Sequence, residues 1–203
     1  PFTFYGQTYD TVTICSNGWM AFGNQGLLDQ FRNYPMPAML APDAMIAPYW
    51  DDLKTDGAQG VWHYYDAVNH LYIVQWKAQI YTGGTNLDFE VILKDENFYP
   101  TFDGNGEVLV QYNDVTMGVQ GDYDEPSGCT IGIQAPRGLV ALQYAFLTNY
   151  MPGSTSVVDG RAILFTTAAS MLFGAIEGTV TDAETNLPMT GVDVTIDGYS
   201  YHA

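Results

Sequence analysis

Apolar positions along the chain recur in short runs bounded by turn residues, and the 3.6-residue period of an amphipathic helix is nearly absent. Short runs of this kind are typical of β-strands. The turn dipeptide Asn17-Gly18 and the run at 103–106 (DGNG) are typical of hairpin connections. The pattern therefore predicts an all-β fold, an antiparallel β-sandwich of jelly-roll-like type. The predicted strands are residues 2–5, 11–16, 19–22, 45–49, 61–66, 71–79, 87–94, 107–112, 129–134, 139–146 and 161–166.

Three segments depart from the strand pattern. Residues 26–43 contain Pro35, Pro37 and Pro42, which disfavour ladder and helix alike, so we expect a long surface loop with at most one helical turn. Residues 118–128 form a second polar loop. Composition changes near 170–174, and residues 175–181 and 192–196 follow as two strands. Because so short a tail cannot bury a core, we predict a sandwich over 1–170 and the first strands of an incomplete second domain over 171–203.

Charge narrows the function classes. The 203 residues include 23 Asp and Glu against 6 Lys and Arg, a formal net charge of −17. Such a field repels nucleic acid and anionic membrane surfaces. No apolar run reaches the roughly 18 residues of a membrane span. We expect an extracellular or cell-surface protein, part of a longer polypeptide whose export signal lies upstream.

Calcium is the cofactor that the acidic loops suggest. Calcium takes six to eight oxygen ligands, commonly carboxylates from one or two loops. Solvated acidic loops and a plain hairpin turn explain the same residues. The candidate ligands are Asp51, Asp52 and Asp56; Asp103, Asn105 and Glu107; and Asp122, Asp124 and Glu125.

The two cysteines leave a disulfide open. Cys15 and Cys129 are 114 residues apart, and no C-x-x-C motif is present. A bridge closing so long a loop contributes about 4 to 5 kcal/mol in the chain-entropy model. Strand parity opposes the pairing, since Cys15 is in phase with Thr13 and Cys129 with Ile131. The alternative is two buried thiols.

Enzymatic motifs are few. No G-x-S-x-G, H-E-x-x-H or P-loop pattern occurs. Asp88 and Glu90 share one face of a predicted strand, where paired carboxylates could cleave a glycosidic bond beside Tyr64, Tyr72 and Trp76. Solvent-facing strand residues are the simpler interpretation, and we expect no catalytic residues.

Carbohydrate binding without catalysis is a second alternative, because Tyr and Trp rings stack on sugars. Candidate loops for such a surface contain residues 81–84, Tyr123 and Tyr150. Ordinary sheet packing of these aromatic residues is the competing interpretation, and it also covers Trp19, Trp62 and Trp76 as core or half-buried side chains.

Three stretches in order carry a family resemblance. They are residues 2–6 (FTFYG) with 12–23 (VTICSNGWMAFG); residues 46–53 (IAPYWDDL); and residues 106–112 (GEVLVQY) with 130–134 (TIGIQ). The set resembles the nidogen-like (NIDO-type) extracellular β-sandwich of large secreted bacterial proteins. The resemblance implies a non-catalytic module of adhesive or cell-surface proteins and brings no catalytic residues.

The tail carries a second resemblance. Residues 176–183 (IEGTVTDA), 187–189 (LPM) and 191–196 (GVDVTI) resemble the opening of a carboxypeptidase regulatory-like, transthyretin-like β-sandwich. Half a sandwich leaves strand edges exposed. We therefore expect a structural or adhesive module whose partners are neighbouring domains, polysaccharide or further copies of itself, joined into a filament by strand addition. The candidate assembly residues are Ile176, Val180, Val192, Val194 and Ile196.

Overall fold

The computed structural model describes residues 1–26, 28–81, 86–115 and 128–167, Thr185, and the backbone of 194–196 and 199–201. The chain divides into two compact units, residues 1–169 and 170–203. Within the described residues of the first unit, the regular structure is antiparallel β-sheet with one short 3-10 helix, η1 (Pro136–Gly138). The predicted all-β sandwich is confirmed. Among the described residues, no helix is long and apolar enough to cross a membrane.

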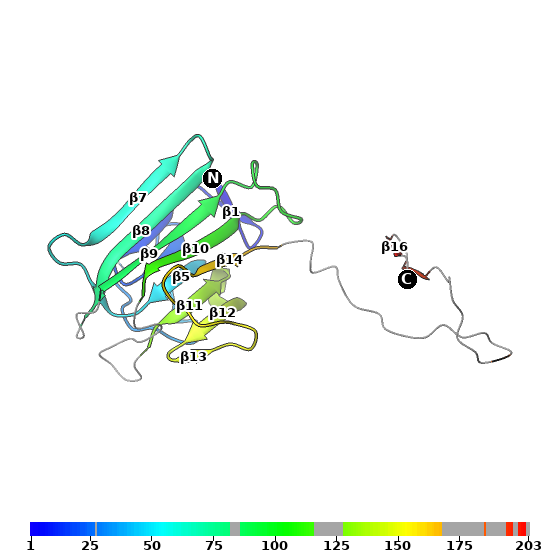
Figure 1. Ribbon diagram of the computed structural model, residues 1–203. Helices are drawn as coiled ribbons and strands as arrows, with labels where there is room; N and C mark the ends of the chain where they lie inside the picture. The colour runs from blue at the N-terminus through cyan, green and yellow to red at the C-terminus, as the bar shows by residue number, and fades with distance from the viewer. Residues whose placement is uncertain are drawn as a thin grey trace. The chain divides into compact units, whose positions relative to one another are not determined.

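Two antiparallel sheets face each other in the first unit (Figure 1). The first sheet runs β14-β10-β9-β8-β6, and β7 also pairs with β8. The second runs β13-β12-β11-β5-β4-β3, and β1 and β2 form a separate hairpin. The bounds in the first sheet are β6 (Leu53–Lys54), β7 (Gly60–Asp66), β8 (Leu71–Ile80), β9 (Asn86–Lys94), β10 (Glu107–Asp114) and β14 (Ala162–Phe165). Those in the second are β3 (Val12–Cys15), β4 (Trp19–Phe22), β5 (Met45–Trp50), β11 (Thr130–Gln134), β12 (Ala141–Phe146) and β13 (Asn149–Tyr150), and those of the hairpin are β1 (Phe2–Phe4) and β2 (Gln7–Tyr9).

The main core lies between the sheets and is rich in aromatic rings. Trp76 and Phe89 stack with centroids 5.4 Å apart, and Tyr49 stacks on the same Phe89. Two buried hydrogen bonds cross from one sheet to the other. Trp76 Nε1 donates to the carbonyl of Cys15 at 2.8 Å, and Tyr112 Oη donates to the carbonyl of Pro48 at 2.7 Å. The polar tips of these buried rings are thereby satisfied.

The proline-rich segment 26–43, expected to be a surface loop, covers the other face of the second sheet. Trp19 and Trp50 both donate their Nε1 protons to the carbonyl of Gln30, each at 2.9 Å. The buried Gln134 side chain accepts from the amide of Ala38 and donates to its carbonyl. A second buried cluster forms here from residues of β3, β4, β5 and this segment. It consists of Cys15, Trp19, Ala21, Met36, Met45, Ala47 and Trp50.

The connection between β3 and β4 differs from the predicted two-residue turn. Cys15 pairs with Trp19, so three residues form the loop, and the last of them, Gly18, has φ +70°. A three-residue hairpin loop commonly ends in a left-handed residue, which glycine adopts without strain. The Asn17 side chain accepts a hydrogen bond from the amide of Leu53, so this turn also contacts the strand exit after β5.

In the second unit, β15 (Val194–Ile196) pairs with β16 (Tyr199–Tyr201). β15 lies within the predicted strand 192–196. The predicted strand 175–181 lies outside the described residues.

Candidate functional site

β7 is an exposed edge strand of the first sheet (Figure 1). All seven of its residues pair with β8 in unbroken register, and no strand in the described part of the chain pairs with its other edge. Trp62, Tyr64 and Tyr65 are 46%, 63% and 55% exposed. The strand contains no Lys, Pro or bulge, the features that usually protect an edge from pairing with another chain.

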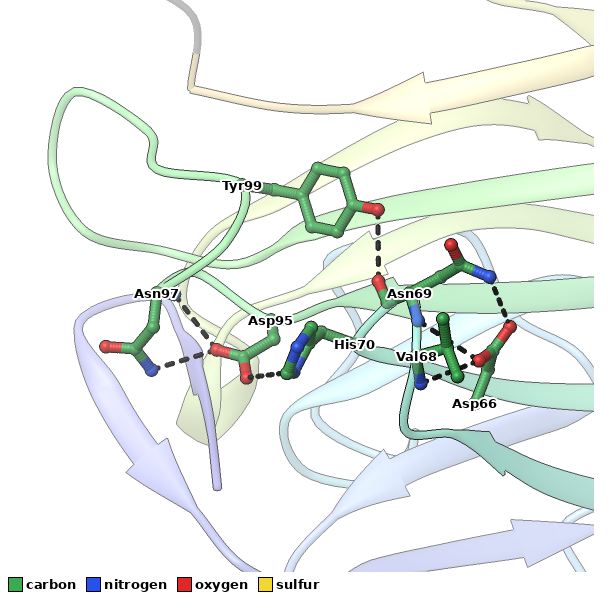
Figure 2. Close-up of polar contacts among 7 residues, drawn as sticks. All are labelled: Asp66, Val68, Asn69, His70, Asp95, Asn97 and Tyr99. Atoms are coloured by element: carbon green, nitrogen blue, oxygen red, sulfur yellow. Dashed lines mark hydrogen bonds and ion pairs between the residues drawn. The ribbon is translucent and has the colours of Figure 1, made fainter.

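The hairpin that ends β7 is held by a polar network, shown in Figure 2. The Asp66 carboxylate accepts hydrogen bonds from the amides of Val68 and Asn69 and from the Asn69 side chain. The Tyr99 hydroxyl donates to the carbonyl of Asn69 at 3.0 Å. The loop after β9 therefore ties down the loop between β7 and β8, and the edge strand is presented on a fixed hairpin.

His70 and Asp95 complete this network (Figure 2). His70 Nδ1 lies 4.0 Å from Asp95 Oδ2, and the Asp95 amide donates to the His70 carbonyl. The hydrogen bond from the Asn97 amide lowers the pKa of Asp95, and hydrogen bonds from Asn69 lower that of Asp66. Both carboxylates therefore stay ionised near neutral pH and keep the loops joined. Their contribution to stability is present above their ordinary pKa and is lost as pH falls through the lowered folded-state values.

A polar hollow of about 390 Å³ lies on the outer face of the same sheet. Gln75, Glu90 and Gln111 stand directly opposite one another on β8, β9 and β10 and form one row on this face. Asp88 is held by the side chains of Gln75 at 2.8 Å and Asn113 at 3.1 Å. The hollow is lined by Gln75, Asp88, Phe89, Glu90, Gln111, Tyr112, Asn113, Gly160, Arg161 and Ala162.

One charged group in this hollow lacks a partner among the described residues. The Glu90 carboxylate has no hydrogen bond or ion pair there. Arg161 lies opposite the core-facing Tyr112, and its charge partly offsets the rise that burial causes in the pKa of Tyr150 in the other sheet, so its side chain belongs to the core side. Burial raises the pKa of Glu90, and the negative charge of Asp88 raises it further. Asp88 also lies 3.5 Å from Lys77 Nζ. The predicted pair Asp88 and Glu90 thus shares the hollow, with Asp88 engaged by neighbours and Glu90 available to a ligand.

The predicted calcium ligands lie in different environments. Asp51 is buried and accepts a hydrogen bond from the amide of Asp52, whereas Asp56 is exposed. In the second group, Asp103 accepts from the amide and side chain of Asn105, and Glu107 lies 2.9 Å from Lys94 Nζ. Asp122, Asp124 and Glu125 lie outside the described residues. Within the described ranges, no three His, Cys, Asp or Glu side chains form a group that could hold a metal ion, and calcium binding stays a prediction.

The two cysteines are not paired in this structure. Both are buried and free. Cys15 belongs to the cluster beneath segment 26–43, whereas Cys129 lies in the core between the sheets. The disulfide that the sequence left open is therefore absent, because the two thiols sit on opposite sides of the second sheet, as their strand parity indicates. Burial raises the pKa of Cys129 well above its ordinary value.

The residues predicted to mediate assembly and those predicted to bind sugar do not form one site. Ile176, Val180 and Val192 lie outside the described residues, and Val194 and Ile196 are in β15. Of the residues proposed to bind sugar, Trp76 is buried in the core. The hydroxyl of Tyr150 accepts a hydrogen bond from the amide of Val157. Tyr81 is exposed, and 82–84 and Tyr123 are outside the described part.

Sequence reasoning did not distinguish Trp62 from the two core tryptophans. It assigned Trp19, Trp62 and Trp76 together to core or half-buried positions. In the structure Trp62 is half-buried, with 46% of its surface exposed, and the other two are fully buried. The sequence of β7 could have indicated this difference, because the strand contains no Leu or Ile and has aromatic residues on both of its faces. A strand whose one branched aliphatic residue is Val61 has no face suited to a sandwich core.

Comparison with known families gives one match. The family model described as NIDO related matches residues 1–169. No curated protein and no solved structure matches the chain. The match ends before the tail, so the resemblance of residues 176–196 to a carboxypeptidase regulatory-like domain stays a prediction. The match covers most of the chain and coincides with the two-sheet unit, and the chain therefore belongs to the NIDO-related family.

Proposed function

We propose that this chain is a non-catalytic extracellular module that serves adhesion or assembly by accepting a strand from a second copy along β7. NIDO-related domains are typically extracellular, which agrees with the acidic composition. The observation that carries the proposal is the unprotected edge of β7 with its exposed Trp62, Tyr64 and Tyr65.

Backbone geometry makes β7 a suitable acceptor. A regular edge strand presents a row of N–H and C=O groups to an incoming extended segment, and each net hydrogen bond contributes about 0.5–1.5 kcal/mol. Aromatic side chains on both faces of β7 would cover the flanks of the added strand through cross-strand contacts. The donor in this proposal is the tail, whose residues 175–181 carry the alternating pattern of a strand.

Charge predicts an unusual salt response. Two copies each carry a formal charge of −17, so their long-range interaction is repulsive, whereas residues 61–65 of β7 carry no Asp, Glu, Lys or Arg. Added salt screens the repulsion and leaves the backbone pairing intact. Association through β7 is therefore expected to strengthen with salt, unlike association through ion pairs.

The test is sedimentation of the full 203-residue chain at increasing concentration and at two salt concentrations. Tyr64→Lys places a charge on the edge strand, and Val180→Pro removes a backbone donor from the proposed tail strand. Both are expected to abolish self-association. Phe102→Lys is the matched control, because Phe102 is 73% exposed in a loop, and it should associate like the parent chain.

Two results would overturn the proposal. One is a parent chain that stays monomeric at the highest concentration and salt. The other is equal association by Tyr64→Lys and the Phe102→Lys control. Circular dichroism of each variant establishes that the sheets are intact.

A further inference from the structure

An aromatic pocket of about 480 Å³ opens between the hairpin of β1 and β2 and the first sheet. Its lining comes from that hairpin, from β3 and β4 of the second sheet, and from β7, β8 and the ends of β8 and β9 in the first. The volume is within the range of small-molecule sites. The pocket shares no lining residue with the polar hollow on the outer face of the first sheet.

The inner part of the pocket is apolar. Phe2, Phe22 and Leu93 line it, and all three are buried side chains of the main core. Phe22 stacks with Phe2 and with Tyr9, in each case with the ring centroids 5.2 Å apart. An apolar ligand group placed against these side chains would be removed from water, which favours its binding.

Tyrosine rings line the part of the pocket nearer to solvent. Tyr65 and Tyr72 stand opposite each other on β7 and β8, and Tyr72 stands opposite the core residue Leu93. Both tyrosines are therefore on the core-facing side of their strands, yet Tyr65 is 55% exposed. The face of an aromatic ring carries partial negative charge and attracts a cation within about 6 Å.

Two carboxylates lie in the same lining. Asp10 precedes β3, and Asp95 follows β9. Asp10 accepts a hydrogen bond from the Thr11 hydroxyl, and Asp95 Oδ1 accepts from the amide and the side chain of Asn97. Asp95 Oδ2 lies 4.0 Å from His70 Nδ1, beyond hydrogen-bond distance (Figure 2). Each carboxylate therefore keeps acceptor capacity for a ligand.

Charge complementarity favours a cation in this pocket. Among the described residues that line it, none is Lys or Arg, and the positive groups are the Pro1 amino group and, when protonated, His70. Hydrogen bonds from Asn97 lower the pKa of Asp95, and the charges of His70 and of the Pro1 amino group lower it further. Positive charge at this place thus stabilises the ionised carboxylate. The chain's formal charge of −17 also attracts cations and repels anions.

We infer that this pocket binds a small organic ammonium ion. The apolar body of the ligand packs against Phe2, Phe22 and Leu93. Its ammonium group lies beside Asp10 and Asp95 and contacts the tyrosine rings. An inorganic cation would leave the apolar part of the pocket unused, and an anion would meet two like charges. The site is on the core side of β7 and does not use the outer backbone edge, so the inference does not rest on self-association.

The test titrates the full chain, at a concentration where it sediments as a monomer, with probes of similar size: phenethylammonium, phenethyl alcohol and hydrocinnamate. We expect phenethylammonium to bind most tightly and to shift the amide resonances of Thr11, His70 and Asp95. Asp10→Asn and Asp95→Asn should each weaken its binding about fivefold, the loss of one partly exposed ion pair. Asp56→Asn is the matched control, because it removes an equal charge from an exposed residue outside the pocket.

A second pair of variants tests the tyrosine ring. Tyr65→Leu keeps apolar bulk but removes the ring, so it should weaken phenethylammonium more than phenethyl alcohol. Tyr81→Leu is its control, because Tyr81 is 49% exposed and lies outside the pocket. Acetylation of the Pro1 amino group removes a competing positive charge and should strengthen binding.

Salt separates this inference from the proposed self-association. Added salt should weaken phenethylammonium binding, because it screens the attraction to the carboxylates, whereas self-association is expected to strengthen. The inference is overturned if phenethylammonium binds no more tightly than phenethyl alcohol, if hydrocinnamate binds more tightly, or if Asp10→Asn binds like Asp56→Asn. Asp10 is an exposed residue outside the regular strands, so its variant is expected to fold, which the amide spectrum of each variant verifies.

Discussion

Replacing Gly18 by alanine tests the close approach of the β3–β4 turn to the end of β5. Gly18 has φ +70°, and a Cβ built there would lie 1.8 Å from the carbonyl oxygen of Tyr49. That oxygen belongs to the backbone of a buried strand and cannot rotate away. The left-handed conformation costs an alanine about 1–2 kcal/mol, and forcing an atom into a filled space costs about 1–3 kcal/mol more.

Gly23 provides the matched control. Its φ is +78°, but a Cβ there would meet nothing within 4 Å. Gly23→Ala should therefore lose only the conformational part, about 1–2 kcal/mol. The difference between the two variants isolates the clash with Tyr49, and we expect Gly18→Ala to be less stable than Gly23→Ala by about 1–3 kcal/mol.

Urea unfolding followed by tryptophan fluorescence measures both free energies. Trp19 adjoins the turn, and Trp50 ends the strand that the turn approaches, so the signal reports on this region. Equal losses in the two variants, within about 0.5 kcal/mol, would refute the reasoning, because additivity errors are of that size. The same result would mean that the turn can move away from β5 at little cost.

Three further predictions concern a core indole, a half-buried carboxylate and the two thiols. Trp76→Phe should lower the free energy of unfolding by about 1–3 kcal/mol, because the carbonyl of Cys15 loses the indole donor and stays buried; a urea titration measures it. Glu90→Gln should stabilise the chain at pH 7, because burial and Asp88 raise the pKa of Glu90 and so penalise its ionised form above that pKa. The gain should disappear as pH falls through the raised folded-state pKa, which thermal melts across pH would show, and a pH-independent gain would contradict the assignment. Without reductant, Cys15 and Cys129 should both react quickly with a thiol reagent in the unfolded chain and slowly in the native one. If the unfolded chain showed no reactive thiol, the two cysteines would instead form a disulfide.

Local sequence pattern predicts most of this fold because each long strand carries its own signal. β4 was predicted with its observed bounds, and β8 and β9 within one residue at each end. β2, β6 and β13 were missed, since they contain only two or three residues and owe their conformation to the strand beside them. Tertiary context, and not local preference, determines such short pairings.

The site was harder to predict than the fold. The period of two places Asp88 and Glu90 on one face, but Gln75 and Gln111 come to lie beside them only through the register of β8, β9 and β10. Register between strands distant in sequence is not encoded in any one segment. The role of segment 26–43 was hidden for a similar reason: prolines predicted a loop, but the carbonyl of Gln30 that pairs two indole groups has no signature in the sequence.

The two hydrogen bonds that cross between the sheets have a mechanical consequence. Apolar contact between stacked sheets strongly opposes their separation but is non-directional, so it opposes sliding only weakly. The bonds from Trp76 to the carbonyl of Cys15 and from Tyr112 to that of Pro48 are directional, and each must break before one sheet can shift along the other. A pulling force applied in the plane of the sheets must therefore break both hydrogen bonds before the sheets can slide, and the sandwich resists shear more than apolar packing alone would allow.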